Sequence, residues 1–144
     1  MQVLSSFSLL LALPILAETK VFEIFLKDHL FTPSTLYVPA DEKVKLVIHN
    51  QDPTPEEFES FSLNREKVIL GQGKGVVFIG PLQPGEHAFI GEYNPDTARG
   101  TIVVLPKAQW LQRHAAAKDQ TSRTNMIDSA VGPVTSNTTT IRSK

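Results

Sequence analysis

The sequence predicts an all-β protein, a Greek-key β-sandwich or barrel of seven or eight short strands. In several short runs, apolar and polar side chains alternate at every second residue, as they do where one face of a strand is buried. Clusters rich in Pro, Gly, Asn and Asp separate these runs at regular spacing. No stretch before Pro106 carries an apolar stripe at helical spacing, so we expect strands throughout that part.

The expected strands follow one another from residue 22 to residue 105. The first run alternates over residues 22–27, and a later one alternates over residues 43–49, where His49 is expected to point to solvent. Residues 101–105 are almost entirely apolar, which is typical of a strand covered on both faces. The other strands are expected at residues 36–38, 58–63, 67–70, 75–79 and 87–90.

The two ends of the chain differ in composition from this strand-rich part. Residues 1–17 fit the pattern of an export signal, because an apolar segment from Phe7 to Leu16 is followed by the small residue Ala17. The alternative is a buried N-terminal strand or helix. One short helix is expected over Ala108 to Lys118, and then a disordered tail, since Thr121 to Lys144 has almost no large apolar side chains to bury. The expected organisation is a signal peptide at residues 1–17, one domain at residues 18–106, and a helix with a tail at residues 107–144.

Length and composition exclude several classes of protein. A chain of 144 residues has room for one domain with a real core. The formal net charge of −1 provides no electrostatic footprint for nucleic acid or for an anionic membrane. Because the chain has no Cys, it has no disulfide, thiol nucleophile or thiolate metal ligand. No catalytic Ser/His/Asp order, phosphate loop or zinc motif stands out, so the sequence does not indicate catalysis.

Short motifs in a characteristic order are spread over residues 21–105. They are Phe31-Thr32-Pro33, Val38-Pro39-Ala40, Val44-Lys45-Leu46, Asn50-Gln51-Asp52, Glu57-Phe58 and Pro84-Gly85, and together they resemble the framework of the cupredoxins, in its periplasmic single-domain form. A second set resembles, more narrowly, the cysteine-less cupredoxin-like proteins found beside high-affinity iron permeases in bacteria. This set comprises Glu56-Glu57-Phe58-Glu59-Ser60, Arg65-Glu66-Lys67-Val68, Gly80-Pro81-Leu82 and Gly91-Glu92-Tyr93.

The resemblance also indicates which residues stand where cupredoxins hold copper. A blue-copper centre uses one Cys thiolate, two His and usually a weakly bound Met. The chain has no Cys, and its two Met residues lie near its two ends. Blue-copper electron transfer is therefore excluded on ligand chemistry. The positions of the first His, the Cys, the second His and the Met correspond in turn to Glu56, Gly91, Asn94 and either Thr97 or Ala98.

Carboxylates at and near these positions point to a hard cation instead. Carboxylate oxygens suit iron and manganese, or calcium where enough oxygens converge. Glu56 and Glu92 are expected to converge at one end of the sandwich, whereas Glu57 and Glu59 alternate onto the opposite face of their strand. The resemblance places His29 in a loop near the same end. The candidate metal-binding residues are therefore Glu56, Glu57, Glu59, Glu92 and His29, with iron as the expected cofactor and copper as the less favoured one.

Each candidate also has a purely structural explanation. Glu57 and Glu59 fit a solvated strand face that pairs with basic residues nearby. Glu66 stands between two basic residues and fits an exposed ion pair. Glu56 follows a Pro and fits an ordinary turn carboxylate, and His29 fits a plain loop residue. The other histidines are not expected to be ligands; they are His49, His87 and His114.

The function predicted from these residues and from the resemblance is iron capture in the periplasm. The protein would bind iron, or help to oxidise ferrous iron, and hand it to a membrane iron permease and other periplasmic iron-uptake components. A homodimer would be one way to complete a site with few ligands, and no nucleic-acid partner is expected. Two alternatives remain open. One is a metal-free cupredoxin-fold interaction module whose carboxylates dock a basic patch on a membrane partner, and the other is a non-blue copper-handling protein.

Overall fold

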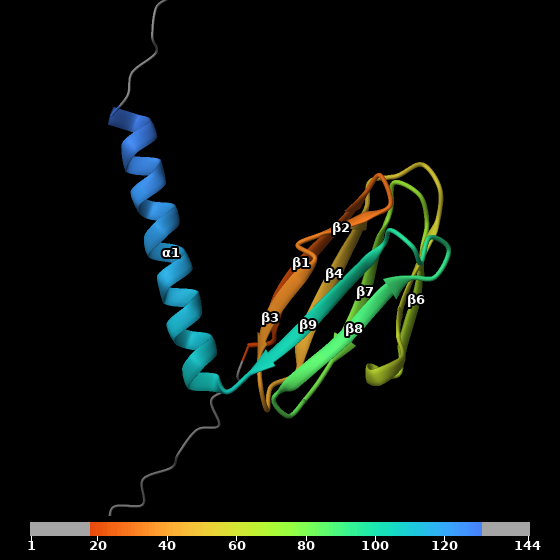
Figure 1. Cartoon of the computed structure of the whole chain (residues 1–144), viewed down its shortest axis with the longest axis horizontal. Coiled ribbons are helices and arrows are strands. Elements are labelled where there is room, and N and C mark those ends of the chain that lie inside the picture. The colour runs from red at the N-terminus through yellow and green to blue at the C-terminus, as the bar shows by residue number, and fades with distance from the viewer. Residues whose placement is uncertain (1–17, 131–144) are drawn as a thin grey trace, which may run out of the picture.

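Two β-sheets packed face to face form the body of the protein, shown in Figure 1. The computed structural model describes residues 18–130, with side-chain environments described to residue 126. One sheet has four strands in the order β2-β1-β4-β7, and the other has five in the order β3-β9-β8-β5-β6. The strands are β1 (Lys20–Lys27), β2 (Leu30–Thr32), β3 (Thr35–Pro39), β4 (Val44–Asn50), β5 (Glu56–Ser60), β6 (Arg65–Ile69), β7 (Lys74–Ile79), β8 (Gly85–Gly91) and β9 (Arg99–Leu105).

The β-sandwich expected from the period-two pattern is confirmed, with nine strands over residues 18–130 rather than seven or eight. The additional strand, β2, forms because Asp28 and His29 adopt positive φ angles of 52° and 56°, which turns the chain back along β1. The run expected at residues 58–63 is divided. β5 ends at Ser60, a 3-10 turn (Phe61–Leu63) follows, and Asn64 at φ 49° turns the chain into β6.

The core lies between the sheets and consists of the inward-facing residues that the alternation predicted. In β4, Val44, Leu46 and Ile48 are all buried, while the residues between them are partly exposed. The rings of Phe58 on β5 and Phe89 on the neighbouring strand β8 stack in the core, with their centroids 5.2 Å apart. Burying one such side chain contributes about 1.5–3 kcal/mol. Packing of Phe58 therefore fixes which face of β5 points to the core and which faces outward.

Helix α1 (Lys107–Ala130) is longer than the short helix expected over residues 108–118, and it includes the start of the expected tail. No Pro or Gly interrupts the sequence between Pro106 and Gly132, so no residue there strongly disfavours a helix. An ion pair between Asp119 and Arg123, which are four residues apart, joins their side chains at 3.1 Å and stabilises the second half of the helix. The expected signal peptide and the rest of the expected tail lie outside the described residues. No helix within residues 18–130 is long and apolar enough to span a membrane.

The first turns of α1 attach it to the sandwich beside β3, as Figure 1 shows. Trp110 is 6% exposed, and its indole N–H donates a 3.0 Å hydrogen bond to the backbone carbonyl of Tyr37. The ammonium group of Lys107 lies 2.9 Å from the carboxylate of Glu42. Residues 111–126 are exposed, so the helix is held mainly through its N-terminal end.

Candidate functional site

A hydrogen-bonded network is centred on Glu56 and includes the positions that the sequence resemblance assigns to copper ligands of cupredoxins. Glu56 is the first residue of β5 and is 1% exposed. Its Oε1 accepts hydrogen bonds from the backbone N–H groups of Glu57, at 3.0 Å, and Tyr93, at 2.9 Å. Its Oε2 accepts one from the side-chain amide of Asn94, at 2.7 Å. Three donors thus satisfy a carboxylate that would be costly to bury alone.

Gly91 lies directly against this carboxylate, in the space where a larger residue would not fit. A Cβ added to Gly91 would lie 2.7 Å from Cδ of Glu56 and 2.7 Å from the Cβ of Ala98. Ala98 is fully buried, and its carbonyl accepts a 2.8 Å hydrogen bond from the N–H of Gly91. Glu56, Gly91, Asn94 and Ala98, the residues that the resemblance assigns to copper-ligand positions, therefore form one packed, hydrogen-bonded set.

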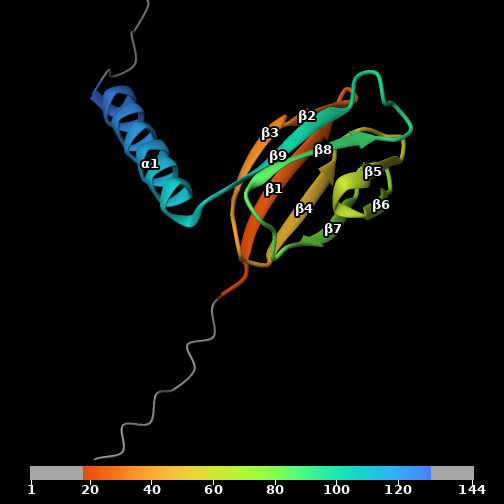
Figure 2. The same ribbon diagram turned by 60° about the horizontal axis from the view of Figure 1, so that its bottom comes forward.

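A second group of carboxylates covers the outward face of β5 and its two neighbours. Glu57 and Glu59 face away from the core, opposite to Glu56, as the alternation predicted. Glu66 on β6 is the direct cross-strand partner of Glu59. On the other side, the N–H of Glu92 donates to the carbonyl of Glu57 at 2.8 Å. We refer to Glu57, Glu59, Glu66 and Glu92 as the outer carboxylate cluster. Figure 2 shows β5 and β6 on the side of the sandwich away from α1.

Within this cluster, Glu59 is the most buried residue, and its carboxylate has no partner in the described part of the chain. Glu59 is 8% exposed, and no hydrogen bond or ion pair engages its side chain in the described part of the chain. Burial raises the pKa of Glu59, and the negative charges of Glu66, Glu92 and Glu57 raise it further. Like charges directly opposite each other on neighbouring strands destabilise a sheet. The cluster therefore carries an excess of negative charge that a bound cation would relieve.

Basic side chains do not neutralise the cluster. None of the ion pairs found within residues 18–126 includes one of its four carboxylates. Arg65, one of the two basic residues next to Glu66 in the sequence, donates instead to the backbone carbonyls of Phe78, at 2.9 Å, and Asn64, at 2.7 Å. The cluster thus does not form the surface ion pairs that the sequence also allowed.

Tyr93 stands beside the cluster, and sequence reasoning did not identify it. It directly follows Glu92, and its backbone N–H donates a 2.9 Å hydrogen bond to Glu56. Burial raises the pKa of Tyr93, and the negative charges of Glu57, Glu92 and Glu56 raise it further. The side chain is still 50% exposed, so its oxygen is within reach of solvent. The sequence feature that could have identified Tyr93 is its position directly after Glu92, just beyond the end of β8.

The structure brings three of the five predicted metal-binding residues together in the outer carboxylate cluster. Of the other two, Glu56 faces the core, and His29 lies in the turn between β1 and β2, 3.6 Å from Asp52. The Asp52 carboxylate also accepts hydrogen bonds from the backbone N–H groups of Asp28, at 2.7 Å, and His29, at 3.0 Å. Burial alone would raise the pKa of Asp52, but these hydrogen bonds hold it below its usual value. His29 therefore belongs to a turn stabilised by Asp52, apart from the cluster.

The remaining histidines are held in other contacts. His49 was expected to face solvent, but it stacks on Phe25, its register partner in β1, with ring centroids 4.7 Å apart. His87 lies 3.1 Å from a serine hydroxyl, and His114 stacks on Trp110. Among residues 18–130, no three His, Cys, Asp or Glu side chains are arranged as a ready set of metal ligands. The outer carboxylate cluster is therefore not preformed as a metal site.

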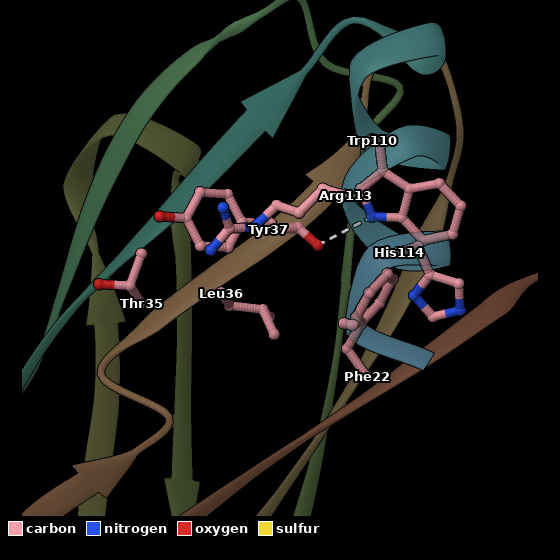
Figure 3. A pocket seen from close by; sticks show the side chains of 8 residues that line it. Phe22, Thr35, Leu36, Tyr37, Trp110, Arg113 and His114 are labelled. Carbon is pink, nitrogen blue, oxygen red and sulfur yellow. Dashed lines mark hydrogen bonds between the residues drawn. The ribbon is translucent and has the colours of Figure 1, made fainter. Parts of the chain in front are cut away.

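A separate hollow of about 270 Å³ lies between α1 and the strands β3 and β1. Figure 3 shows the guanidinium group of Arg113 over the ring of Tyr37, at 3.5 Å, and the indole N–H of Trp110 directed to the Tyr37 carbonyl. These residues attach the helix to the sandwich. The hollow lies at the β3 edge of the five-stranded sheet, whereas the outer carboxylate cluster lies toward the opposite edge, at β6.

A family model for a cupredoxin-like domain matches residues 3–104, more than half of the chain. The protein belongs to the cupredoxin-like domain family. This agrees with the cupredoxin resemblance found in the sequence, and the absence of Cys makes the protein a cysteine-less member. The residues that the resemblance assigns to the copper-ligand positions of this cupredoxin-like protein belong to the Glu56 network, and none of them is Cys or His.

This cupredoxin-like protein is 43% identical over 82 residues to an uncharacterised protein of Rickettsia prowazekii (strain Madrid E). That match covers 57% of this chain and 66% of the relative, just under two thirds of the relative's length. Among solved structures, it is similar to the metal-binding domain of the Cu(I)-exporting P-type ATPase CopA of Streptococcus pneumoniae D39, with a TM-score of 0.54 and 15% identity. That match covers 59% of this chain and 84% of the other.

It is also similar to auracyanin A, a blue copper protein of Chloroflexus aurantiacus, with a TM-score of 0.51 and 14% identity. That match covers 61% of this chain and all of the other, 100%. At such identities the likeness shows the fold alone. It confirms the cupredoxin-like β-sandwich and relates the chain to a fold used by copper proteins.

Proposed function

We propose that this cupredoxin-like protein binds iron through the outer carboxylate cluster and serves iron uptake together with a membrane permease. The observation that carries the proposal is Glu59, a largely buried residue whose carboxylate has no partner in the described part of the chain and lies near the charges of Glu66, Glu92 and Glu57. Such an arrangement costs stability in the absence of a cation, because each carboxylate disfavours ionisation of the others. A bound cation would offset the repulsion among the carboxylates, because each of them would be attracted to its positive charge.

The chemistry of the donors selects the class of cation. Carboxylate oxygens are hard ligands, which suit iron, manganese or calcium rather than Cu(I). Directly opposed residues in an antiparallel pair have Cβ atoms about 4.5–5.5 Å apart, so rotation of the side chains brings carboxylates on adjacent strands to one ion. Within this class, the resemblance to proteins found beside iron permeases favours iron. Copper is less suited, because the Glu56 network engages the side chains at the corresponding positions.

The position of the cluster suits delivery of a cation to another protein. β6 is the edge strand of the five-stranded sheet, and Glu66 and Glu92 are exposed. A partner could therefore reach the cation without opening the core. In this proposal the protein acts in the periplasm after export through residues 1–17, and the permease or a second copy of the chain completes the ligands.

A second function would use the same surface without a metal. Phe61 follows β5 and is 80% exposed, so an acidic face lies beside an exposed aromatic ring. Such a surface suits a basic partner, because complementary charge speeds association and the aromatic ring supplies contact area. The protein would then be a cupredoxin-fold interaction module.

Calorimetric titration of the protein with Fe(II) under anaerobic conditions, with Fe(III) citrate and with Cu(II) tests the proposal. Glu59→Gln and Glu92→Gln should each weaken iron binding about tenfold or more, because each keeps the shape and removes a charge. Glu86→Gln, at an exposed position of β8 outside the cluster, is the matched control and should bind iron like the wild type. Equal iron binding by the wild type and the Glu59/Glu92 double variant would favour the interaction module instead.

A further inference from the structure

We propose that copies of this protein associate head to tail, with a lysine-rich face of the four-stranded sheet of one copy docked on the outer carboxylate cluster of the next copy. The lysine-rich face lies on the outer side of the four-stranded sheet, and the cluster lies on the outer side of the five-stranded sheet. The inference goes beyond the proposed function, because it assigns a surface away from the cluster and does not require iron.

The lysine-rich face is formed by outward-pointing residues of β4 and β7. In both strands every second residue is buried in the core, so the residues between them point outward. We call this surface the lysine face and define it by Lys43, Lys45, Val47, Lys74, Val76 and Phe78. Lys45 pairs in register with Phe78, and the ammonium group of Lys43 lies 4.8 Å from the centroid of the same ring. Lysine side chains thus lie beside exposed apolar ones.

The lysine face is open to solvent, and its charges are unpaired. Val76 is 41% exposed and Phe78 is 45% exposed. None of the ion pairs found within residues 18–126 includes one of the three lysines. Glu23, an outward residue of the neighbouring strand β1, lies 3.7 Å from Nε2 of His49 instead. Exposed apolar side chains rimmed by polar ones are typical of a surface that contacts another molecule.

The outer carboxylate cluster provides the complementary surface. Val68, which pairs in register with Glu57, is 46% exposed, so this face also combines charges with an apolar side chain. The whole chain has a formal net charge of −1, so the two faces are opposite patches on a nearly neutral molecule. Complementary charge favours a partner, and like charge excludes one. Contact between two lysine faces, or between two clusters, is therefore disfavoured, and the occupant of each face is the opposite face of a second copy.

The positions of the two faces make the contact head to tail. The sheets pack face to face, so their outer sides point in opposite directions (Figure 1). Helix α1 attaches at β3, whereas β5 and β6 lie toward the other edge of the same sheet, so the helix does not cover the cluster. A contact between two different faces leaves one face of each kind free at the ends of the assembly. Association therefore continues past the dimer instead of closing at it.

Sedimentation velocity of the full chain tests the proposal, over a series of protein concentrations and with EDTA present to keep metal ions off the cluster. In low salt, the mean mass should rise with concentration past that of a dimer. In about 1 M NaCl, where the screening length is about 3 Å, the protein should be monomeric, because the attraction between the faces is electrostatic.

Two double variants locate the contact. Lys45→Gln/Lys74→Gln removes two charges from the lysine face, and Glu57→Gln/Glu66→Gln removes two from the cluster. Each should weaken self-association about tenfold or more. Both change side chains that point away from the core, so circular dichroism should show the wild-type fold for each.

An equimolar mixture of the two double variants is the decisive sample. One variant keeps its cluster and the other keeps its lysine face, so the mixture should form a one-to-one complex that stops at the dimer. The matched control is Lys118→Gln/Arg123→Gln, which removes two charges from the exposed part of α1 and should associate like the wild type.

The proposal would be overturned by a wild type that stays monomeric in low salt, by an association that neither double variant weakens, or by a mixture that stays monomeric. Vesicles of anionic phosphatidylglycerol test another occupant of the lysine face. Binding of a monomeric wild type to these vesicles, lost in Lys45→Gln/Lys74→Gln, would overturn the head-to-tail contact and assign the face to a membrane. Iron binding is measured separately by titration, so failure of either proposal leaves the other intact.

Discussion

The side-chain amide of Asn94 donates a 2.7 Å hydrogen bond to the carboxylate of Glu56, and this contact joins the loop before β9 to the start of β5. The sequence resemblance assigns both residues to positions of histidine ligands in cupredoxins. In those proteins the two segments are connected through a metal ion, whereas here the side chains connect them directly. The loop is therefore fixed without a cation, and the inward-facing Glu56 is kept apart from the carboxylates on the outward face.

Replacing Glu56 by two different residues tests this structural role. Glu56→Ala should lower the free energy of unfolding by about 2–4 kcal/mol, because the buried donors of Tyr93 and Asn94 lose their acceptor. Glu56→Gln should cost only about 1–2 kcal/mol, since its amide oxygen still accepts and Asn94 can rotate to present its own oxygen. Urea denaturation of the three proteins measures both values. Equal costs for the two variants would contradict a role based on hydrogen bonding.

Period-two alternation was sufficient to predict the parts of the structure that depend on burial. It placed Val44, Leu46 and Ile48 on the inward face of one strand, and all three are buried in the core. It also placed Glu57 and Glu59 together, opposite to Glu56, because side chains alternate strictly along a strand. The carboxylate character of the site followed directly from residue type.

Pairing between strands could not be predicted from the sequence with the same success. Glu66 lies opposite Glu59 because Asn64, at φ 49°, sets the register of the hairpin between β5 and β6. His49 appeared to point to solvent, but its partner in β1 is Phe25, and the two rings stack. Both outcomes depend on which residue of a neighbouring strand lies opposite, and alternation within one strand does not contain that information.

Lowering the pH should remove the loss of folding stability that the ionised Glu59 carboxylate causes. Its pKa is raised in the folded protein, so the folded state holds the proton at pH values where the unfolded chain has lost it. The free energy of unfolding then falls as pH rises from the ordinary pKa of Glu through the raised value, and it stays lower above that range. Glu59→Gln removes this penalty. Its thermal midpoint should exceed that of the wild type at neutral pH, and the gain should disappear below about pH 4.

Glu86→Gln is the control for that comparison, because it removes one carboxylate from the same sheet but outside the cluster. It should show no comparable gain at neutral pH. A gain for Glu59→Gln that persists unchanged at acid pH would mean that repulsion among ionised carboxylates is not its cause.

The attachment of α1 should depend on one side chain rather than on the length of the helix. Trp110→Ala should lower the free energy of unfolding by about 3 kcal/mol, because it removes a buried aromatic side chain and its hydrogen bond to Tyr37. Deleting residues 119–144 should change it by less than about 0.5 kcal/mol, since the described side chains of that segment are exposed. Thermal unfolding of both variants checks this, and a larger loss on deletion would show that the distal helix packs.

The packing around Gly91 can be tested with a matched pair of glycines in β8. Gly91→Ala should lower the free energy of unfolding by about 1–3 kcal/mol, because the new Cβ would lie 2.7 Å from both Glu56 and Ala98. Gly85→Ala should be close to neutral, since nothing lies within 4 Å of its added Cβ. The double variant Gly91→Ala/Ala98→Gly should recover part of the loss, because it removes one of the two clashes and the sites are in contact. If urea denaturation shows equal effects of Gly91→Ala and Gly85→Ala, the space beside Glu56 is larger than the structure indicates, and the network would then leave room for a side chain at the position of the missing cysteine.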